Sequence, residues 1–181
     1  QRDRILIVTI NRPKAKNAVN AAVADARPAF IYHLAGAAHV GDAWDKTGDA
    51  LAINALGTHH VIDAARGSGL KPRILIPSSA YVYQASDTAI DEDTPVRPNS
   101  PYGVTKLAQE MAGLKAFEHD GVPVVISRSF NHVGPRQAPS FSTSSFARQI
   151  ATIEIGKAEP VILVGNLAAR RDLTDVRDTV R

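Results

Sequence analysis

Short apolar runs alternate along this chain with longer segments of helical periodicity, and this alternation limits the possible folds more than any other feature. The runs are rich in β-branched residues and span 5–10, 30–34, 73–77, 122–127 and 161–164. The helical patterns lie between them, at about 17–26, 47–66, 101–119 and 141–156. Strands that alternate with helices are typical of a parallel sheet covered by helices. We therefore predict an α/β fold built on a partial doubly wound parallel sheet.

Composition excludes several classes of protein and of site. The 181 residues include no cysteine, so disulfides, thiolate metal ligands and cysteine nucleophiles are excluded. The net charge of +3 is too small to indicate nucleic-acid binding, and no apolar run approaches the roughly 20 residues that span a bilayer. The six histidines lack the spacing of metal ligands. We expect a globular cytoplasmic protein with no metal site and no membrane or nucleic-acid partner.

Tyr102 and Lys106 lie four positions apart in a segment that is predicted to be helical from Ser100-Pro101 onwards. Serine is favoured at a helix N-cap and proline at the first helical position. Residues i and i+4 share a helix face, so the ammonium of Lys106 can approach the phenol of Tyr102. A nearby cation favours the phenolate, so we expect a lowered pKa for Tyr102 and a role in proton transfer. Taken alone, the pair could also be a solvent-facing pair without function.

A second polar motif, Ser78-Ser79, lies at the carboxyl end of the predicted strand 73–77, where open α/β sheets place their sites. Together with the Tyr-x-x-x-Lys helix, it resembles the extended short-chain dehydrogenase/reductase family, also called the NAD-dependent epimerase/dehydratase family. In that family a Ser or Thr, a Tyr and a Lys form the catalytic set. The resemblance covers about residues 29–181 and implies a Rossmann-like fold in which Ser79, Tyr102 and Lys106 are catalytic.

The same resemblance implies a site for NADP or NAD. His33-Leu34-Ala35-Gly36 looks like the strand and loop that this family places against the cofactor, and Asn54 matches the family's helical asparagine. The cofactor-binding residues implied in this way are Leu34, Ala35, Gly36, Asn54, Tyr102 and Lys106.

Three further motifs narrow the implied substrate. Phe130-Asn131-His132, Gly165-Asn166-Leu167 and Arg171-Asp172 are similar to segments of the GDP-4-keto-6-deoxy-mannose reductases and the GDP-mannose 4,6-dehydratases. By this resemblance the substrate is a GDP-linked sugar. Guanidinium groups suit its pyrophosphate, although each arginine could instead form an ordinary surface ion pair. The implied substrate-binding residues are Ser79, Asn131, Arg136 and Arg171.

The residues after Ser79 favour one of these two activities. A dehydratase needs an additional acid and base to remove one proton and protonate a departing hydroxyl, and in the family acidic residues follow the Ser or Thr directly. Here Ala80 and Tyr81 occupy these positions. We therefore expect a reductase or epimerase rather than a dehydratase.

The N-terminal part departs from the family. No glycine precedes Gly36, so the glycine-rich turn that holds a dinucleotide pyrophosphate is missing or replaced, and we expect weak cofactor binding. Residues 1–26, with Asn11-Arg12-Pro13 and Asn17-Ala18, resemble the opening of the crotonase (enoyl-CoA hydratase) family. We therefore predict a chimera, with a crotonase-like segment at 1–28 and a short-chain reductase-like core at 29–181 that is truncated in its substrate domain.

Two alternatives to a reductase remain open. One is a non-catalytic recombined domain that has lost its cofactor site, and the other is a CoA-ester-binding protein related to the crotonases. In each case a partial sheet leaves faces and edges uncovered, and such surfaces favour pairing between chains. We therefore also expect a homodimer.

Overall fold

The computed structural model describes residues 25–181, which belong to two compact units. The first unit extends to Arg128 and the second comprises Ser129–Arg181. The predicted strand 5–10 lies outside the described residues, as do nearly all of the predicted helix 17–26 and most of the crotonase-like segment 1–28. Within residues 25–181, no helix is long and apolar enough to cross a lipid bilayer.

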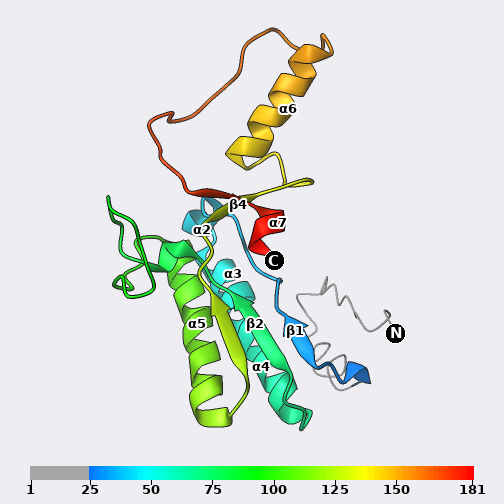
Figure 1. Ribbon diagram of the computed structural model, residues 1–181, viewed down its shortest axis with the longest axis vertical. Helices are drawn as coiled ribbons and strands as arrows, with labels where there is room; N and C mark the ends of the chain where they lie inside the picture. The colour runs from blue at the N-terminus through cyan, green and yellow to red at the C-terminus, as the bar shows by residue number, and fades with distance from the viewer. Residues whose placement is uncertain (1–24) are drawn as a thin grey trace. The chain divides into compact units, whose positions relative to one another are not determined.

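The first unit contains a three-stranded parallel sheet in the order β1–β2–β3 (Figure 1). The strands are β1 (Phe30–Tyr32), β2 (Arg73–Pro77) and β3 (Val124–Ser127). Ile31 pairs with Ile74, and Ile76 pairs with Ile126. The parallel strands and the helices between them confirm the α/β prediction. All three carboxyl ends lie at the same edge of the sheet, as parallel pairing requires.

An interrupted helical segment connects β1 to β2. It consists of α2 (Asp42–Asp45), α3 (Thr47–Leu51), a π-helical turn η1 (Ala52–Leu56) and α4 (Gly57–Gly67). The sequence predicted one uniform helix over 47–66, and these residues are helical. The π turn was not predicted, because one widened turn hardly changes the spacing of apolar residues in the sequence.

α5 (Pro101–Asp120) begins as the sequence predicted. Ser100 Oγ accepts a hydrogen bond from Gly103 N at 3.1 Å, and Pro101 is the first helical residue. At the other end Gly121 has a φ of 65°, and Val122 N bonds to Ala116 O at 3.1 Å. This is a glycine C-cap, in which the left-handed residue directs the following amides back to the last helical carbonyls.

α4 and α5 pack against one face of the sheet and form the core of the first unit with it (Figure 1). Ile74 and Ile76 of β2 are completely buried in this core. The close packing of α5 depends on Gly113, because a Cβ at this position would lie 2.7 Å from Ile76 Cδ1. On the other face of the sheet Tyr32 is 68% exposed and Val125 is 49% exposed.

The second unit contains a pair of parallel strands and two helices. The elements are β4 (Asn131–Val133), α6 (Ser142–Glu154), β5 (Leu173–Asp175) and α7 (Val176–Thr179). α6 agrees with the helix predicted at 141–156. The two strands were not predicted, because three residues are too few to show a strand alternation in the sequence.

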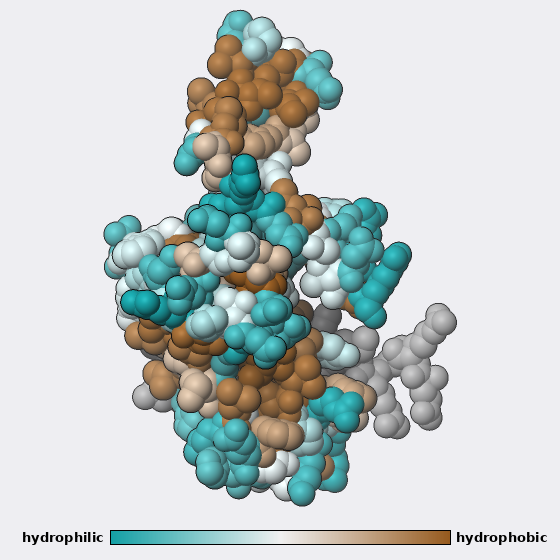
Figure 2. All heavy atoms as spheres, turned by 60° about the vertical axis from the view of Figure 1, so that its left-hand side comes forward, coloured by the Kyte–Doolittle hydropathy of each residue, from teal (hydrophilic) through white to brown (hydrophobic). Residues whose placement is uncertain are grey.

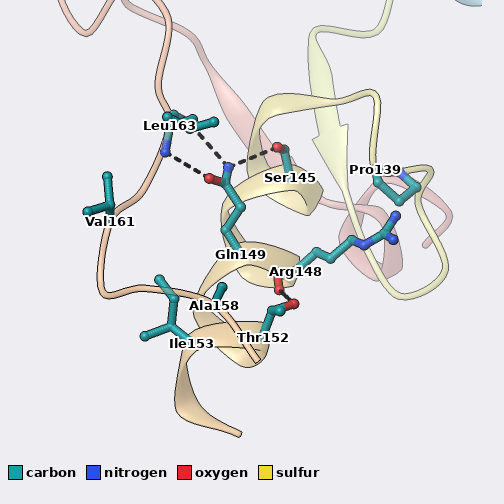
Figure 3. A pocket seen from close by; sticks show the side chains of 9 residues that line it. All are labelled: Pro139, Ser145, Arg148, Gln149, Thr152, Ile153, Ala158, Val161 and Leu163. Carbon is teal, nitrogen blue, oxygen red and sulfur yellow. Dashed lines mark hydrogen bonds between the residues drawn. The ribbon is translucent and has the colours of Figure 1, made fainter. Parts of the chain in front are cut away.

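The prediction of a strand at 161–164 is wrong. Among residues 25–181, no strand pairs with residues 161–164, and the Gln149 side chain of α6 bonds to this segment instead (Figure 3). Gln149 Oε1 accepts from Leu163 N at 2.8 Å, and Gln149 Nε2 donates to Leu163 O at 3.1 Å. A side-chain amide thus satisfies the backbone groups that a neighbouring strand would satisfy.

α6 and this segment border an open hollow of about 480 Å³, lined in part by Arg148 and Ile153 (Figure 3).

Candidate active site

Ser79 lies at the carboxyl end of β2, two residues beyond the last residue of the strand. It is the N-cap of a short 3-10 helix, η2 (Ala80–Val82), and its Oγ accepts a hydrogen bond from Tyr81 N at 3.2 Å. The preceding residue, Ser78, is also buried, and its Oγ has no hydrogen-bond partner among the described residues. Two hydroxyl groups thus lie at the edge of the sheet where parallel α/β folds place their sites.

Tyr102 approaches Ser79 because the first turn of α5 packs against η2. Gly103 makes this approach possible: a Cβ there would lie 2.9 Å from Pro98 Cβ and would overlap the carbonyl oxygen of Tyr81. The Tyr102 phenol lies close enough to the Ser79 side chain for this neighbour to affect its pKa. Its ring also packs edge-on against Tyr81, with ring centroids 5.8 Å apart and an interplanar angle of 86°. The structure therefore brings Ser79 and Tyr102 together, as the resemblance implied.

The pKa of Tyr102 is raised, and the lowered pKa expected from the sequence is wrong. Burial of the phenol is the largest cause, since it disfavours the phenolate. The nearby Ser79 side chain lowers the pKa of Tyr102, and the neighbouring Tyr81 raises it. Lys106 does share the helix face of Tyr102, but its ammonium is bound elsewhere.

Lys106 is buried, with only 7% of its surface exposed, and it points to the carboxyl end of β2. Its Nζ donates to Pro77 O at 2.6 Å and to Gln109 Oε1 at 2.7 Å. Burial lowers the pKa of Lys106 to about 8, although the nearby Glu110 carboxylate raises it. Lys106 is thus fixed at the same edge of the sheet as Ser79, with part of its population neutral near pH 8.

Glu110 is itself buried, and an arginine compensates its charge. Arg128 Nη2 donates to Glu110 Oε2 at 2.8 Å and Arg128 Nε donates to Oε1 at 3.0 Å. The guanidinium carbon of Arg128 also lies 4.9 Å from the ring centroid of Tyr83. This group of three side chains ties α5 to the end of β3 and to the segment after Ser79.

The loop that follows β1, which contains Leu34, Ala35 and Gly36, lies at the carboxyl end of β1 and therefore at the same edge of the sheet. Asn54 of the π turn holds this loop. Its Oδ1 accepts from Ala37 N at 2.8 Å, and its Nδ2 donates to Thr105 Oγ1 at 2.8 Å. Asn54 is completely buried, so the structure places it behind the loop, in contact with Ala37 and α5.

Gly36 is the position where the loop comes closest to this asparagine. A Cβ at Gly36 would lie 3.1 Å from Asn54 Oδ1. Glycine therefore lets the backbone of the loop lie directly over the Asn54 amide. The opposite side of the loop is open to solvent, and Leu34 there is 75% exposed.

The other implied substrate residues, Asn131, Arg136 and Arg171, lie in the second unit, and all three are exposed. Asn131 pairs with Leu173 in the β4–β5 ladder, so Arg171 lies just before the strand that adjoins Asn131. Arg171 Nη1 donates to Arg170 O at 2.7 Å. Arg136 follows β4 with a φ of 70°. The structure therefore brings Asn131 and Arg171 to one end of a small sheet.

Four residues around Lys106 were not identified as part of the site from the sequence. They are His33, Thr58, Gln109 and Glu110, and all are buried. One signal was available: Gln109 and Glu110 are polar, and they follow Lys106 at the i+3 and i+4 positions of a helix face that also carries catalytic candidates. Within residues 25–181, no group of three His, Asp or Glu side chains is arranged to hold a metal ion.

Known proteins share the sequence and fold of this chain. A family model described as GDP-mannose 4,6 dehydratase matches residues 13–181. The GDP-6-deoxy-D-mannose reductase of Pseudomonas aeruginosa is 37% identical over 156 residues, which cover 84% of this chain and 51% of that protein. Human GDP-mannose 4,6 dehydratase is 31% identical over 165 residues, which cover 86% of this chain and 42% of that protein. The chain thus spans about half the length of the curated relatives it matches.

Solved structures agree with these sequence relatives. The structure of RMD from Pseudomonas aeruginosa complexed with NADPH has a TM-score of 0.86 and 33% identity, and the match covers 97% of this chain and 62% of that one. MoeE5 in complex with UDP-glucose and NAD has a TM-score of 0.76 and 32% identity, with 91% and 54% coverage.

The family match begins at residue 13, inside the segment that resembles the crotonases. Residues 13–26 thus match the same family as the rest of the chain, and the chimera at 1–28 stays a prediction without support from these relatives. The matched length and the Ser79, Tyr102 and Lys106 arrangement lead to one conclusion: the chain belongs to the GDP-mannose 4,6 dehydratase family, within the NAD-dependent epimerase/dehydratase superfamily.

Proposed function

We propose that this chain forms the catalytic core of an NAD(P)-dependent reductase that acts on a GDP-linked 4-keto-6-deoxy-hexose. The observation that carries the proposal is the convergence of Ser79, Tyr102 and Lys106 at the carboxyl end of β2. The Pseudomonas relative that is 37% identical is a GDP-6-deoxy-D-mannose reductase, and its name supports this substrate class.

Ser79 and Tyr102 supply the proton chemistry in this proposal. Ser79 Oγ donates a hydrogen bond to the carbonyl oxygen of the substrate, and Tyr102 transfers its hydroxyl proton to the same oxygen as the carbonyl is reduced. The raised pKa keeps Tyr102 protonated at neutral pH, which is the form a proton donor needs. The nicotinamide of the cofactor supplies the hydride when it is bound. The Ser79 hydroxyl then stabilises the phenolate that remains.

The described residues fit a dinucleotide at this edge of the sheet. Among the described residues the buried Ser78 Oγ has no partner, and two hydrogen bonds to Pro77 O and Gln109 leave Lys106 one N–H donor. In the proposal Lys106 and Tyr102 contact the cofactor together with Leu34, Ala35 and Gly36, while Asn54 fixes the loop from behind. The solved relative with NADPH favours NADP, and the relative with NAD keeps NAD as the second candidate.

The dehydratase activity that gives the family its description is not the one we propose. Position 80 is an alanine, which cannot transfer a proton, and Tyr81 packs its ring against Tyr102. No carboxylate follows Ser79 directly, so the second acid and base that a dehydration needs are not supplied there.

Asn131, Arg136 and Arg171 are proposed to contact the pyrophosphate of the substrate, because they are exposed amide and guanidinium donors.

The proposal is tested by following NADPH oxidation in the presence of a GDP-linked 4-keto-6-deoxy-hexose. Removing the proton donor in Tyr102→Phe is expected to lower kcat by about a hundred-fold or more, because general acid catalysis has that size. Tyr32→Phe makes the same chemical change at a side chain that is 68% exposed on β1, and it should leave kcat unchanged. Equal turnover in Tyr102→Phe and the unaltered chain would reject the assigned role.

We also propose that the chain forms a homodimer through α5. Val104, Met111 and Leu114 are 47%, 59% and 39% exposed, and with the half-buried Leu107 they follow a three–four spacing along the helix. Such a spacing is typical of helices that pack on another helix. Figure 2 shows apolar residues gathered on the surface of the first unit. A second copy of α5 would cover this stripe.

A further inference from the structure

Lys106 is the first member of a buried hydrogen-bond chain that runs through three elements. Its ammonium donates to Gln109 Oε1 at 2.7 Å, and Gln109 Nε2 donates to Thr58 Oγ1 of α4 at 2.8 Å. Gln109 and Thr58 are each 1% exposed. The side chain of His33, which follows β1, completes the chain, with its Nε2 at 2.9 Å from Thr58 Oγ1.

Counting the available donors shows which atom carries the proton in each of these hydrogen bonds. Thr58 has one hydroxyl proton, and it is used in the bond to Asn54 O at 2.7 Å. The Thr58 oxygen therefore only accepts from its other two partners, so His33 carries its proton on Nε2. The amide of Gln109 is fixed as well, because the reverse orientation would place its NH₂ group against the Lys106 ammonium.

The hydrogen bond to Thr58 thus holds the Gln109 amide in one orientation, with its oxygen directed to the Lys106 ammonium. Pro77 O and Gln109 Oε1 take two of the three N–H groups of the ammonium, and no other residue of the described range 25–181 accepts the third. We infer that Gln109 is a positioning residue for Lys106, holding its ammonium at the carboxyl end of β2. This inference rests on the proposed reductase function.

Charges on the surrounding elements decide how Lys106 responds to a change at position 109. On α5 itself Glu110 favours the ammonium, but Arg128 after β3 compensates the Glu110 charge. His33 beyond β1 is buried, and its pKa is lowered to about 4, so it is neutral at pH 7 and adds no charge. Tyr102 is protonated there because its pKa is raised. Gln109 thus binds the ammonium without a charge of its own.

Two substitutions separate positioning from simple packing. Gln109→Glu keeps the shape and the acceptor but adds a negative charge beside the ammonium, so the pKa of Lys106 should rise by about one unit or more. Gln109→Leu keeps the volume but removes the acceptor, so the pKa should fall. Gln84→Glu adds the same charge at an exposed position, and it should leave the titration of Lys106 unchanged.

The measurement is the titration of Lys106 by NMR of protein labelled with carbon-13 at the lysine Cε, with the signal assigned from Lys106→Arg. The unaltered chain should titrate near the pKa of about 8, and the two variants should move in opposite directions. If the titration midpoint of Lys106 is unchanged in Gln109→Glu, the inference is wrong. Should Gln109→Leu not fold, the result for Gln109→Glu is sufficient to test the inference. The readout needs no turnover, so a chain that shows these shifts and does not oxidise NADPH would refute only the proposed function.

Discussion

At the scale of single residues, His33 makes the stability of the fold depend on pH. It is buried at the end of β1, and burial, together with the charge of Lys106, lowers its pKa to about 4 from the usual 6.5. Between these two values the unfolded chain binds more protons than the folded one, so stability falls as the pH drops from 6.5 towards 4. The full shift corresponds to about 3 kcal/mol of unfolding free energy.

The measurement that isolates this contribution is urea unfolding of the unaltered chain and of His33→Gln at several pH values across that window. The glutamine Nε2 takes the place of the His33 Nε2 that contacts Thr58, and it does not titrate. We predict that the unaltered chain loses about 3 kcal/mol more than the variant between pH 6.5 and pH 4. Parallel curves for the two proteins would show that His33 is not held neutral by the fold.

Part of the candidate site could be proposed from the sequence. Ser79 follows a strand end, Tyr102 and Lys106 share an i, i+4 helix face, and the family resemblance connects the three residues. The bonds from Lys106 through Gln109 and Thr58 to His33 could not be proposed in this way, because Thr58 and Gln109 are 51 positions apart and meet only when α4 packs on α5. The raised pKa of Tyr102 was missed for the same reason, since it depends on burial.

At the scale of elements, the contact between α5 and η2 determines where Tyr102 lies. Gly103→Ala would place a Cβ against the Tyr81 carbonyl and 2.9 Å from Pro98 Cβ, and backbone cannot move aside as a flexible side chain can. We predict a loss of about 1–3 kcal/mol in unfolding free energy, the size of typical overpacking.

The matched control is Gly48→Ala, also inside a helix, where a Cβ would have no neighbour within 4 Å in the described part of the chain. That substitution should stabilise the chain by about 0.5–1 kcal/mol, because alanine is the better helix former. Thermal or urea unfolding of the two variants checks the pair of values. Equal effects at both glycines would contradict the close approach of α5 to η2.

Local chemistry explains which elements could be predicted. Ser100-Pro101 and Gly121 specify both ends of α5 with residues adjacent to those ends, and the predicted helix agreed with the observed one. The run at 161–164 looks like a strand, but an apolar run becomes a strand only when another backbone is available, and here Gln149 bonds to Leu163 instead. Partners of this kind are not visible in local sequence.

At the scale of the whole molecule, the exposed stripe on α5 predicts the oligomeric state. Met111 lies in the middle of the stripe and is 59% exposed, so Met111→Lys should not disturb the fold of the single chain. A charge there would have to be buried in a dimer, which is costly without a partner. Sedimentation over a range of concentrations should show a dimer for the unaltered chain and a monomer for the variant. A monomer at every concentration in both proteins would reject the dimer.

The central claim is that Ser79, Tyr102 and Lys106 form a reductase site. The most direct test is to incubate the chain with NADPH that carries deuterium on the transferred position and with a GDP-linked 4-keto-6-deoxy-hexose, and to analyse the sugar by mass spectrometry. We predict one deuterium on the former carbonyl carbon, at a rate that falls about a hundred-fold or more in Tyr102→Phe. A product without deuterium at saturating NADPH, or equal labelling by Tyr102→Phe, would contradict the claim.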